Sequence, residues 1–424
     1  MPFAQKELCK TLQMMIPERS DIVYGPSHAK SLVESLKPST SQNLTALSKH
    51  KVVDYTKVLM LSMTDEMDDI YKEFVDLREK LNPSTRIYVI TMSRLWGAFR
   101  RRIFDQTDTP SRLNWIPPTE INNFLEQAGF EVIEQRNSVL IPFWIPIFSR
   151  FINRWFSQIP LLRHLSVFTI TTARPLLRTI NHTPSVSVIV AARNEVGNIK
   201  NLIHQLPILS PNQELIFIEG GSQDQTWEII QEAINDNQGK LRYPILAFKQ
   251  TGKGKGDAVR LGFSKASGEI LIILDADLSV PPEELPKFIE NLRLDNCEFA
   301  NGSRLVYPME KQAMQFLNLV GNRFFGIAFS FLIGQPIRDT LCGTKALWAT
   351  DYKKLALQRS YFGEFDPFGD FDLIFGSARL GLKIRDVPVH YKARVYGSTN
   401  ISRFRHGMLL LKMTAFAARR LRFL

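Results

Sequence analysis

In its second half the chain reads Glu269-Ile270-Leu271-Ile272-Ile273-Leu274-Asp275-Ala276-Asp277. A short, strongly aliphatic run of this kind is typical of a buried strand. Two carboxylates two residues apart then leave the strand and project into the crevice at its carboxyl end. Unpaired, they would repel each other, whereas Mg²⁺ or Mn²⁺ takes one or two carboxylates together with phosphate oxygens and water. Asp275 and Asp277 are therefore candidate metal ligands, although a solvated turn with two acids fits this motif alone about equally well.

Strands and helices are expected to alternate around this motif. Such alternation predicts a mostly parallel sheet with helices on both faces. Ligands of these α/β sheets bind beyond the carboxyl ends of the strands. The expected strands are 186–191, 214–218, 243–249 and 270–274, and the expected helices are 196–206, 226–234 and 258–266.

Further polar motifs follow the other expected strands. Ala191-Ala192-Arg193-Asn194-Glu195 can hold a base or ribose edge by hydrogen bonds. In Glu219-Gly220-Gly221-Ser222 the glycines allow a tight turn, and Glu219 can face a nucleotide. The stretch Gly252–Gly256, with Lys253 and Gly254, suits a close anionic ligand before a helix but lacks the spacing of a P-loop. Each motif alone also fits ordinary turn or loop chemistry, so their order along the chain carries the specificity.

The C-terminal stretch is basic, because no acid follows Asp386. Arg394 and Ser398 are candidates for binding a diphosphate or a lipid phosphate, since guanidinium matches phosphate geometry. Residues 408–418 are mostly apolar and are flanked by arginines. This segment suits an anionic membrane surface, and a docked terminal helix with a solvated basic face fits it about as well.

Composition limits the class of protein. The 424 residues carry a formal net charge of +11, which favours anionic partners. Three widely separated cysteines predict a reducing compartment. The N-terminus lacks the apolar core of a signal peptide, and no run of about 20 apolar residues predicts a membrane span. The two most apolar candidates, 139–156 and 316–333, contain prolines or polar residues and are expected to be interfacial or buried.

Residues 184–424 resemble the family 2 glycosyltransferases of the GT-A fold, and among these the dolichyl- or polyprenyl-phosphate sugar transferases. The resemblance covers essentially the whole C-terminal part. It departs from the family pattern at Glu219-Gly220, where two acids are usual, and at Ser279, where a glutamine is frequent. The motifs that carry it are 188–195, 219–226, 253–258, Asp275-Ala276-Asp277-Leu278, Asn301-Gly302-Ser303-Arg304, 339–345, Phe371-Asp372, 386–389 and Arg394 with Gly397-Ser398.

The resemblance implies an inverting, metal-dependent transfer of a sugar from a nucleotide-diphosphate sugar to a lipid, polyprenyl phosphate above all. Mg²⁺ or Mn²⁺ on Asp275 and Asp277 would neutralise the leaving diphosphate. Catalytic roles would fall to Asp277, Asp372, Asp370 and Arg394, and acceptor or phosphate binding to Lys345, Arg394 and Ser398. The residues expected to bind the donor are Ala191, Arg193, Asn194, Glu195, Glu219, Gly221, Lys253, Gly254, Asp275 and Arg304.

Residues 1–175 resemble a class I S-adenosylmethionine-dependent methyltransferase, chiefly its later half, so a partial Rossmann-like domain is expected there. The cofactor end departs from that family. Gly25-Pro26-Ser27-His28-Ala29 stands where a glycine-rich loop belongs, and the stretch from Ala29 to Asp54 is short for a strand, an acid and a helix. Because glycines permit backbone approach to the cofactor, S-adenosylmethionine binding is not expected, and this domain is interpreted as a structural or docking remnant.

Three alternatives to polyprenyl-phosphate transfer remain open. A hydroxyl acceptor on a glycan or glycolipid would require a general base, for which Asp370 and Asp372 are the local candidates. An active methyltransferase would make the chain bifunctional. A nucleic-acid binder is disfavoured, because the central motif is acidic and the basic tail lacks interleaved aromatics. The expected location is the cytoplasm, peripheral on an anionic membrane, in a cell-envelope glycan pathway.

Overall fold

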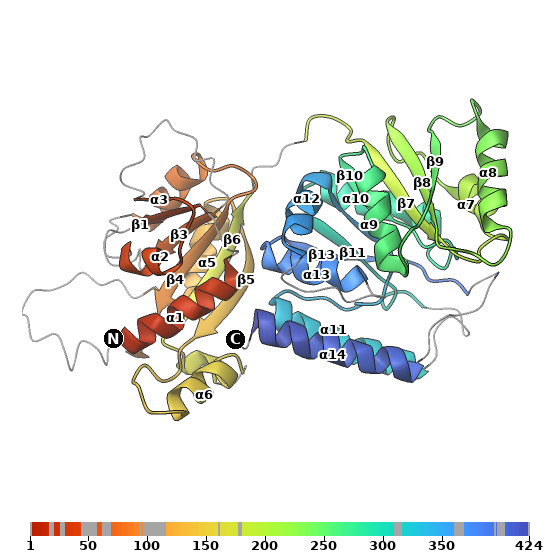
Figure 1. Ribbon diagram of the computed structural model, residues 1–424. Helices are drawn as coiled ribbons and strands as arrows, with labels where there is room; N and C mark the ends of the chain where they lie inside the picture. Colours follow the sequence, from red (N-terminus) through yellow and green to blue (C-terminus); the bar gives the residue numbers. More distant parts are fainter. Residues whose placement is uncertain are drawn as a thin grey trace, which may run out of the picture. The chain divides into compact units, whose positions relative to one another are not determined.

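A computed structural model of the chain describes most of its length. The described residues are 2–16, 21–25, 30–43, 57–61, 69–93, 95–96, 116–159, 162–176, 180–308, 316–359, 369–393, 396 and 403–422. They form two compact units (Figure 1). Unit 1 comprises residues 1–178 together with 418–424, and unit 2 comprises 179–417. The last seven residues, expected to end the C-terminal domain, thus belong to unit 1.

Unit 1 is built on a six-stranded open sheet in the order β2-β1-β3-β4-β6-β5. The first four strands pair in parallel, and β6 runs antiparallel to both β4 and β5. The three-residue β2 lies in the stretch from Ala29 to Asp54, which was expected to be short for a strand, an acid and a helix together. The strands are β1 (Ile22–Gly25), β2 (Ser41–Asn43), β3 (Lys57–Leu61), β4 (Arg86–Met92), β5 (Phe130–Ser138) and β6 (Phe168–Pro175).

Helices cover both faces of this sheet. Alternate residues of β4 point to opposite sides, so each face offers apolar side chains for helices to pack on. Tyr88 and Ile90 pack in one apolar cluster with α1 (Pro2–Met15), while Ile87 and Val89 pack in another with α3 (Ile70–Arg78). The remaining described helices are α2 (Lys30–Ser35), α5 (Pro118–Gln127) and α6 (Phe148–Trp155), with a 3-10 turn at Arg163–Leu165.

Unit 2 contains a seven-stranded sheet in the order β13-β11-β12-β10-β7-β8-β9. Only β12 is reversed: it pairs antiparallel with β10 and β11, and all the other pairs are parallel. The strands are β7 (Val186–Ala192), β8 (Gln213–Glu219), β9 (Ile245–Lys249), β10 (Ile270–Ile273), β11 (Phe299–Ser303), β12 (Lys345–Trp348) and β13 (Ile384–Pro388).

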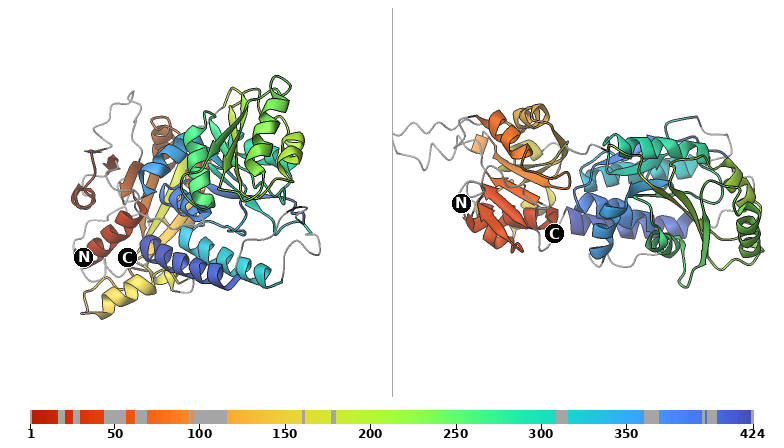
Figure 2. Two further views of the ribbon diagram at one scale, coloured as in Figure 1. Left: turned by 45° about the vertical axis from the view of Figure 1, so that its right-hand side comes forward. Right: turned by 90° about the horizontal axis from the view of Figure 1, so that it is seen from above.

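The helices of unit 2 lie on both faces of its sheet (Figure 1). Ile216 and Ile218 of β8 pack toward α9, whereas Leu215 and Phe217 enter the larger core with α7, α8 and α10. In Figure 1 and in the left view of Figure 2, α11 and α14 lie side by side. The helices are α7 (Ile199–Gln205), α8 (Thr226–Asn237), α9 (Lys255–Lys265), α10 (Leu285–Arg293), α11 (Phe316–Ile333), α12 (Ala349–Leu357), α13 (Gly369–Arg379) and α14 (Arg403–Leu421), with a 3-10 turn at Pro282–Glu284.

This topology brings the polar motifs to one edge. Because six of the seven strands share a direction, their carboxyl ends meet on the same side of the sheet. The residues after β7, β8, β10 and β11, and the start of α9, therefore lie along that edge. The chain is mixed α/β, and no helix among the described residues is long and apolar enough to cross a membrane.

The packing of α9 on the sheet predicts a test of the fold. A Cβ added at Gly262 would lie 2.4 Å from Cγ2 of Ile189 on β7. We expect Gly262→Ala to lower the free energy of unfolding by about 1–3 kcal/mol, the usual cost of overpacking a core. Ser264→Ala, at an exposed position of the same helix, serves as the control and should change it by no more than about 0.5 kcal/mol. Urea unfolding of both variants measures the difference, and equal midpoints would contradict the packing.

Candidate active site

Two of the strand-end loops are joined to each other by hydrogen bonds. The backbone N–H of Asn194 donates to Oγ of Ser222 at 3.0 Å, and the N–H of Gln223 donates to Oδ1 of Asn194 at 2.8 Å. The N–H of Glu195 donates to Oγ1 of Thr226 at 2.9 Å. Asn194 adopts a φ of 58°, which asparagine tolerates better than most residues. The side chain of Asn194 is thus used in joining the loops, which we call the loop clasp (residues 193–196 and 219–226).

Glu219 closes the second loop of the clasp. It is buried at the end of β8, and its Oε1 accepts a hydrogen bond from the N–H of Ser222 at 2.5 Å. Gly221 has a φ of 71° and open space around it, as a tight turn at a ligand requires. Ala191 is half-buried at the end of β7, and Arg193 is exposed beyond it.

A lysine of the glycine-rich loop reaches the acidic motif. Nζ of Lys255 donates to Oδ1 of Asp275 at 2.5 Å. Gly254 precedes it with a φ of 87° and caps α9, while Lys253 is exposed. The sequence prediction named Lys253 and Gly254 and omitted Lys255. The spacing Gly254-Lys255-Gly256 contained the signal, because this lysine stands between two glycines at the start of α9.

Gly343 lies against the same carboxylate. A Cβ at this position would come within 2.1 Å of Oδ2 of Asp275, so no side chain fits there without displacing the motif. Burial would raise the pKa of Asp275, but Lys255, Lys345 and Arg304 together lower it. Asp275 is therefore ionised and surrounded by cations before any ligand arrives.

Asp277 completes the acidic motif. It is buried, and its Oδ1 accepts a hydrogen bond from the N–H of Ser279 at 3.0 Å. Among the described residues no three acidic, histidine or cysteine side chains converge as a ready-made metal site. Two carboxylates still fit Mg²⁺ or Mn²⁺, which commonly complete their shells with phosphate oxygens and water. The donor set thus suits a metal that arrives with, or is completed by, a diphosphate.

A buried ion pair anchors the neighbouring loop. Arg304, after β11, donates from Nε and Nη2 to the two carboxylate oxygens of Asp339 at 2.7 and 2.8 Å. Asn322 of α11 donates to Oδ1 of Asp339 at 2.7 Å. The N–H groups of Arg304 and Leu341 donate to the same carboxylate. Asp339 therefore joins a strand end, a helix and the loop that leads to Gly343.

The pKa values of two buried carboxyl groups, Asp339 in this pair and Asp386 near it, shift in opposite directions. Burial would raise the pKa of Asp339, but the Arg304 guanidinium and the other donors hold it at about 2. Burial raises the pKa of Asp386 to about 6, even though Asn301 and the N–H of Arg338 donate to its carboxylate. The Arg304 guanidinium also stacks 5.0 Å from the ring centroid of Tyr391.

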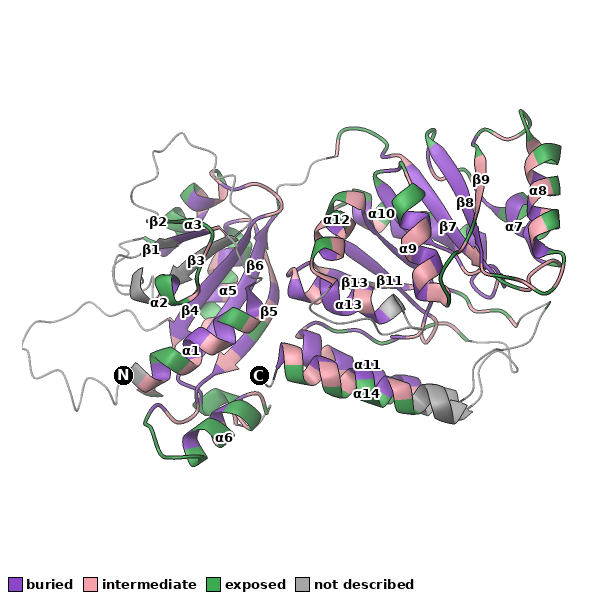
Figure 3. Cartoon of the chain, in the orientation of Figure 1, coloured by how far each residue is buried: buried purple, intermediate pink, exposed green. Residues whose placement is uncertain are grey.

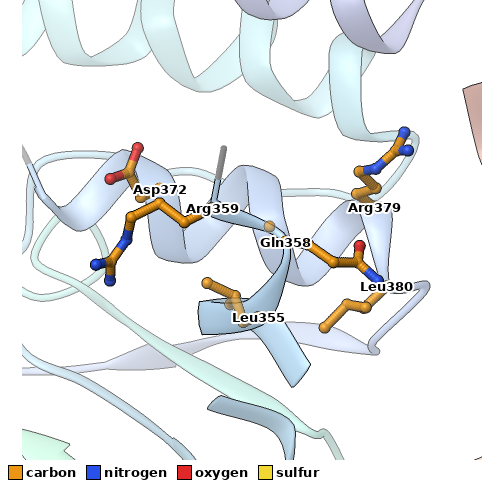
Figure 4. A pocket seen from close by; sticks show the side chains of 7 residues that line it. Leu355, Gln358, Arg359, Asp372, Arg379 and Leu380 are labelled. Carbon is orange, nitrogen blue, oxygen red and sulfur yellow. The ribbon is translucent and has the colours of Figure 1, made fainter. Parts of the chain in front are cut away.

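The residues predicted to act in catalysis or acceptor binding differ in where the structure places them. Lys345 is fully buried at the start of β12, and its Nζ donates to the carbonyl of Cys342. Asp372, on α13, lines a small pocket with residues of α12 and of the turn that follows it, among them Arg359 (Figure 4). The side chain of Asp370 lies outside the described residues, as do Arg394 and Ser398.

Several buried hydroxyl and amide oxygens near the end of β11 lack a protein partner, which is uncommon for buried polar atoms. Polar ligands or ordered water would satisfy such groups. They are Oγ of Ser279, Oδ1 of Asn301, Oγ of Ser303, Oγ1 of Thr340 and Oγ1 of Thr344.

The ion pair of Arg304 and Asp339 predicts a large effect on stability. Asp339→Asn leaves a buried guanidinium unpaired, so we expect the free energy of unfolding to fall by about 3–5 kcal/mol. Glu290→Gln removes the carboxylate of the exposed pair with Arg293 and should change it by less than about 1 kcal/mol. The folded pKa of Asp339 lies below its ordinary value of 3.8. The stabilisation of the fold by the ionised carboxylate is therefore fully present above that pH and is lost as the pH falls toward 2. Equal losses in the two variants would contradict this role.

Known proteins resemble the part of the chain that carries these motifs. Residues 187–355 match the model of the glycosyl transferase family 2. A dolichol-phosphate mannosyltransferase of Pyrococcus furiosus is 36% identical over 124 residues, which are 28% of this chain and 33% of that protein. Glycosyltransferase AglJ of Haloferax volcanii is 29% identical over 198 residues, 46% of this chain and 60% of that protein. An undecaprenyl-phosphate 4-deoxy-4-formamido-L-arabinose transferase of Aeromonas hydrophila is 36% identical over 109 residues, 25% of this chain and 32% of that protein.

A solved structure is also similar: glucosyl-3-phosphoglycerate synthase from Mycobacterium tuberculosis in complex with Mn²⁺, uridine diphosphate and glucosyl-3-phosphoglycerate. It has a TM-score of 0.40 and 19% identity over 56% of this chain and 80% of that chain. The chain spans less than two thirds of the length of each of the curated relatives above. The family match covers strands β7 to β12 and the motifs at their ends, including Asp275 and Asp277. Residues 187–355 of unit 2 are therefore the part of this chain that is similar to the family 2 glycosyltransferases.

Proposed function

We propose that unit 2 transfers a sugar from a nucleotide-diphosphate sugar to polyprenyl phosphate, with inversion at the anomeric carbon and with Mg²⁺ or Mn²⁺ held by Asp275 and Asp277. The observation that carries the proposal is the contact of Lys255 with Asp275 beneath Gly343. A cation and a carboxylate thus lie side by side at the strand-end edge, where a diphosphate and its metal ion would use both. The family match supports the same assignment.

The loop clasp is proposed to bind the nucleoside. Glu219 and Gly221 lie at the end of β8, and Asn194 and Glu195 lie across from them at the end of β7. Because these side chains also hold the two loops together, the nucleoside would meet a preformed surface. Lys253 and Gly254 are proposed to approach the diphosphate from the start of α9.

Positive charge near Asp275 is proposed to stabilise the leaving diphosphate. Lys255, Lys345 and Arg304 all lower the pKa of Asp275, so all three are close enough to interact with added negative charge. Lys255 is half-exposed and can turn from Asp275 to a phosphate oxygen, whereas Lys345 and Arg304 are fixed by their contacts. A bound divalent ion would supply Lewis-acid stabilisation of the same leaving group.

A phosphate acceptor would make few demands on this site. A phosphate is already ionised and needs little general-base help. We propose that Arg394 and Ser398 bind it, with Lys345 nearby. The names of two relatives, acting on dolichol phosphate and undecaprenyl phosphate, support this class of acceptor.

The acceptor would be membrane-borne, which supports a peripheral location on the cytoplasmic face. The adjacent helices α11 and α14 expose large apolar side chains beside cations. The exposed members are Arg323, Phe324, Ile327, Met408, Leu411 and Lys412.

A hydroxyl acceptor remains the second candidate, because Asp372 lies on α13 in a small pocket with Arg359. If Asp372 or Asp370 were the general base, Asp372→Asn or Asp370→Asn would abolish transfer while leaving donor binding intact. Polyprenyl-phosphate transfer should instead survive both changes.

The metal site predicts the first activity measurement. Purified full-length protein is incubated with a panel of uridine- and guanosine-diphosphate sugars, Mn²⁺ or Mg²⁺ and short-chain polyprenyl phosphate. We expect metal-dependent formation of a sugar lipid, and a loss of about 100-fold or more in Asp277→Ala, because metal stabilisation of a leaving group is worth several kcal/mol. Glu283→Ala removes an exposed carboxylate six residues further on and should leave the rate unchanged.

The outcomes separate the candidates. Donor hydrolysis without lipid transfer would move the acceptor to a hydroxyl. Equal activity of Asp277→Ala and wild type would remove the metal role from this residue.

Unit 1 is proposed to bind no S-adenosylmethionine. The loop after β1, residues 26–29, lies outside the described residues, so the proposal rests on its sequence and on β2, whose three residues carry no acid for a ribose. Isothermal titration of the full-length chain should give no saturable heat up to about 1 mM ligand. A following titration with uridine diphosphate and Mn²⁺ checks that the protein is competent. Saturable binding of S-adenosylmethionine would favour a bifunctional enzyme.

A further inference from the structure

The short helix α6 of unit 1 buries polar side chains and exposes apolar ones. The two residues of α6 that are buried are polar, Ser149 and Asn153. The large apolar side chains around them face outward, and Figure 3 shows much of α6 as exposed. Ile147, just before the helix, is 87% exposed. The other exposed members of this surface, which we call the apolar rim, are Phe143, Trp144, Ile145, Phe148, Phe151 and Trp155.

The buried polar side chains hold this arrangement in place. Oγ of Ser149 accepts from the N–H of Ile145 at 2.9 Å and donates to the carbonyl of Phe143 at 2.7 Å. Oδ1 of Asn153 accepts from the N–H groups of Leu140 and Ile141, both at 2.8 Å. Hydrogen bonds to the inner side of the helix therefore fix the turn that presents the apolar rim.

Backbone strain at Ile147 also indicates that the fold holds the apolar rim in an exposed position. Ile147 has a φ of 64°, a conformation that β-branched residues strongly avoid. Such strain persists where the surrounding structure imposes it, and it is concentrated at functional positions. Here it accompanies the most exposed side chain of the rim, so the fold accepts strain without burying Ile147.

The charged residues within the rim segment, residues 143–155, are both arginines. Arg150 and Arg154 lie exposed on α6 among the apolar side chains. The sequence contains no Asp or Glu between Glu134 and Glu195. The guanidinium of Arg154 lies 5.6 Å from the ring centroid of Trp155.

Exposed apolar side chains together with arginines fit a lipid surface better than a second copy of this chain. A second copy docked through the rim would bring Arg150 and Arg154 against their own equivalents, with no acid from this segment to compensate. An anionic bilayer accepts tryptophan and phenylalanine at its interface and lets arginines reach lipid phosphates. A helix of eight residues is about 12 Å long, so it lies on the membrane and does not cross it.

We propose that the apolar rim of unit 1 is a membrane-binding element that docks on a bilayer containing anionic lipid. The inference rests on the proposed function, because a membrane-binding element is useful to the transferase only if its acceptor is a membrane lipid. It assigns to unit 1 a task that does not involve S-adenosylmethionine: holding the transferase at the surface where its acceptor resides.

Vesicle sedimentation of the full-length protein tests this proposal. We expect binding to vesicles of phosphatidylcholine with phosphatidylglycerol, and weaker binding to phosphatidylcholine alone. The double variant Ile147→Ser/Phe151→Ser should lower the vesicle affinity by at least about tenfold, the factor that corresponds to losing burial of one large apolar side chain. Leu357→Ser is the matched control, because Leu357 on α12 is 86% exposed, and it should bind as wild type does. Arg150→Gln/Arg154→Gln should weaken the preference for anionic lipid.

Tryptophan fluorescence locates the contact. Lipids brominated near the head group should quench wild type more than Trp144→Phe/Trp155→Phe, because those two residues would enter the interface. Equal quenching, or equal vesicle affinity of the rim variant and Leu357→Ser, would overturn the proposal. So would a wild-type dimer that the rim variant dissociates while vesicle binding stays the same.

Turnover on short polyprenyl phosphate in detergent separates this inference from the proposed function. A rim variant that loses vesicle binding and keeps this turnover supports both. Wild type that turns over in detergent but binds no vesicles overturns only the membrane-binding element. Wild type that binds vesicles through the rim but transfers no sugar overturns only the proposed activity.

Discussion

The hydrogen-bonded pair of Arg304 and Asp339 holds the candidate site together. Asp339 is fully buried, and it receives donors from the end of β11, from Asn322 on α11 and from its own loop. That loop continues to Gly343, whose backbone lies against Asp275. The position of the acidic motif relative to its cations thus depends on a charge pair that itself need not touch a substrate. Breaking such a buried pair by removing one partner is costly, because the remaining charge stays buried without compensation.

The sequence was most informative where periodicity and strand ends coincide. The run before Asp275 predicted a buried strand over 270–274, and β10 covers Ile270–Ile273 with all four residues buried. Helix starts were harder to predict. The N-cap of α5 is Pro117, which offers no side-chain cap, because the proline that follows it at the first helical position already supplies the required φ.

Contacts between distant loops could not be predicted from local patterns. Asp339 was part of a quoted motif, yet its partner Arg304 lies 35 residues earlier, and only the sheet order brings the two together. The role of Gly343 depends on the close approach of two loops, which no periodicity reports. Local patterns also cannot distinguish an apolar face that is covered from one that is open, and α6 is open because its polar residues turn inward.

The loop clasp has a consequence for how such a domain diversifies. Asn194 and Ser222 belong to different loops, but each satisfies a backbone group of the other's loop. A substitution at either position therefore disturbs both walls of the proposed nucleoside pocket at once. Drift in one loop would be tolerated only with a compensating change in the other. Across descendants of this sequence the two positions should be inherited as a unit, and a new base preference should arise through paired replacements.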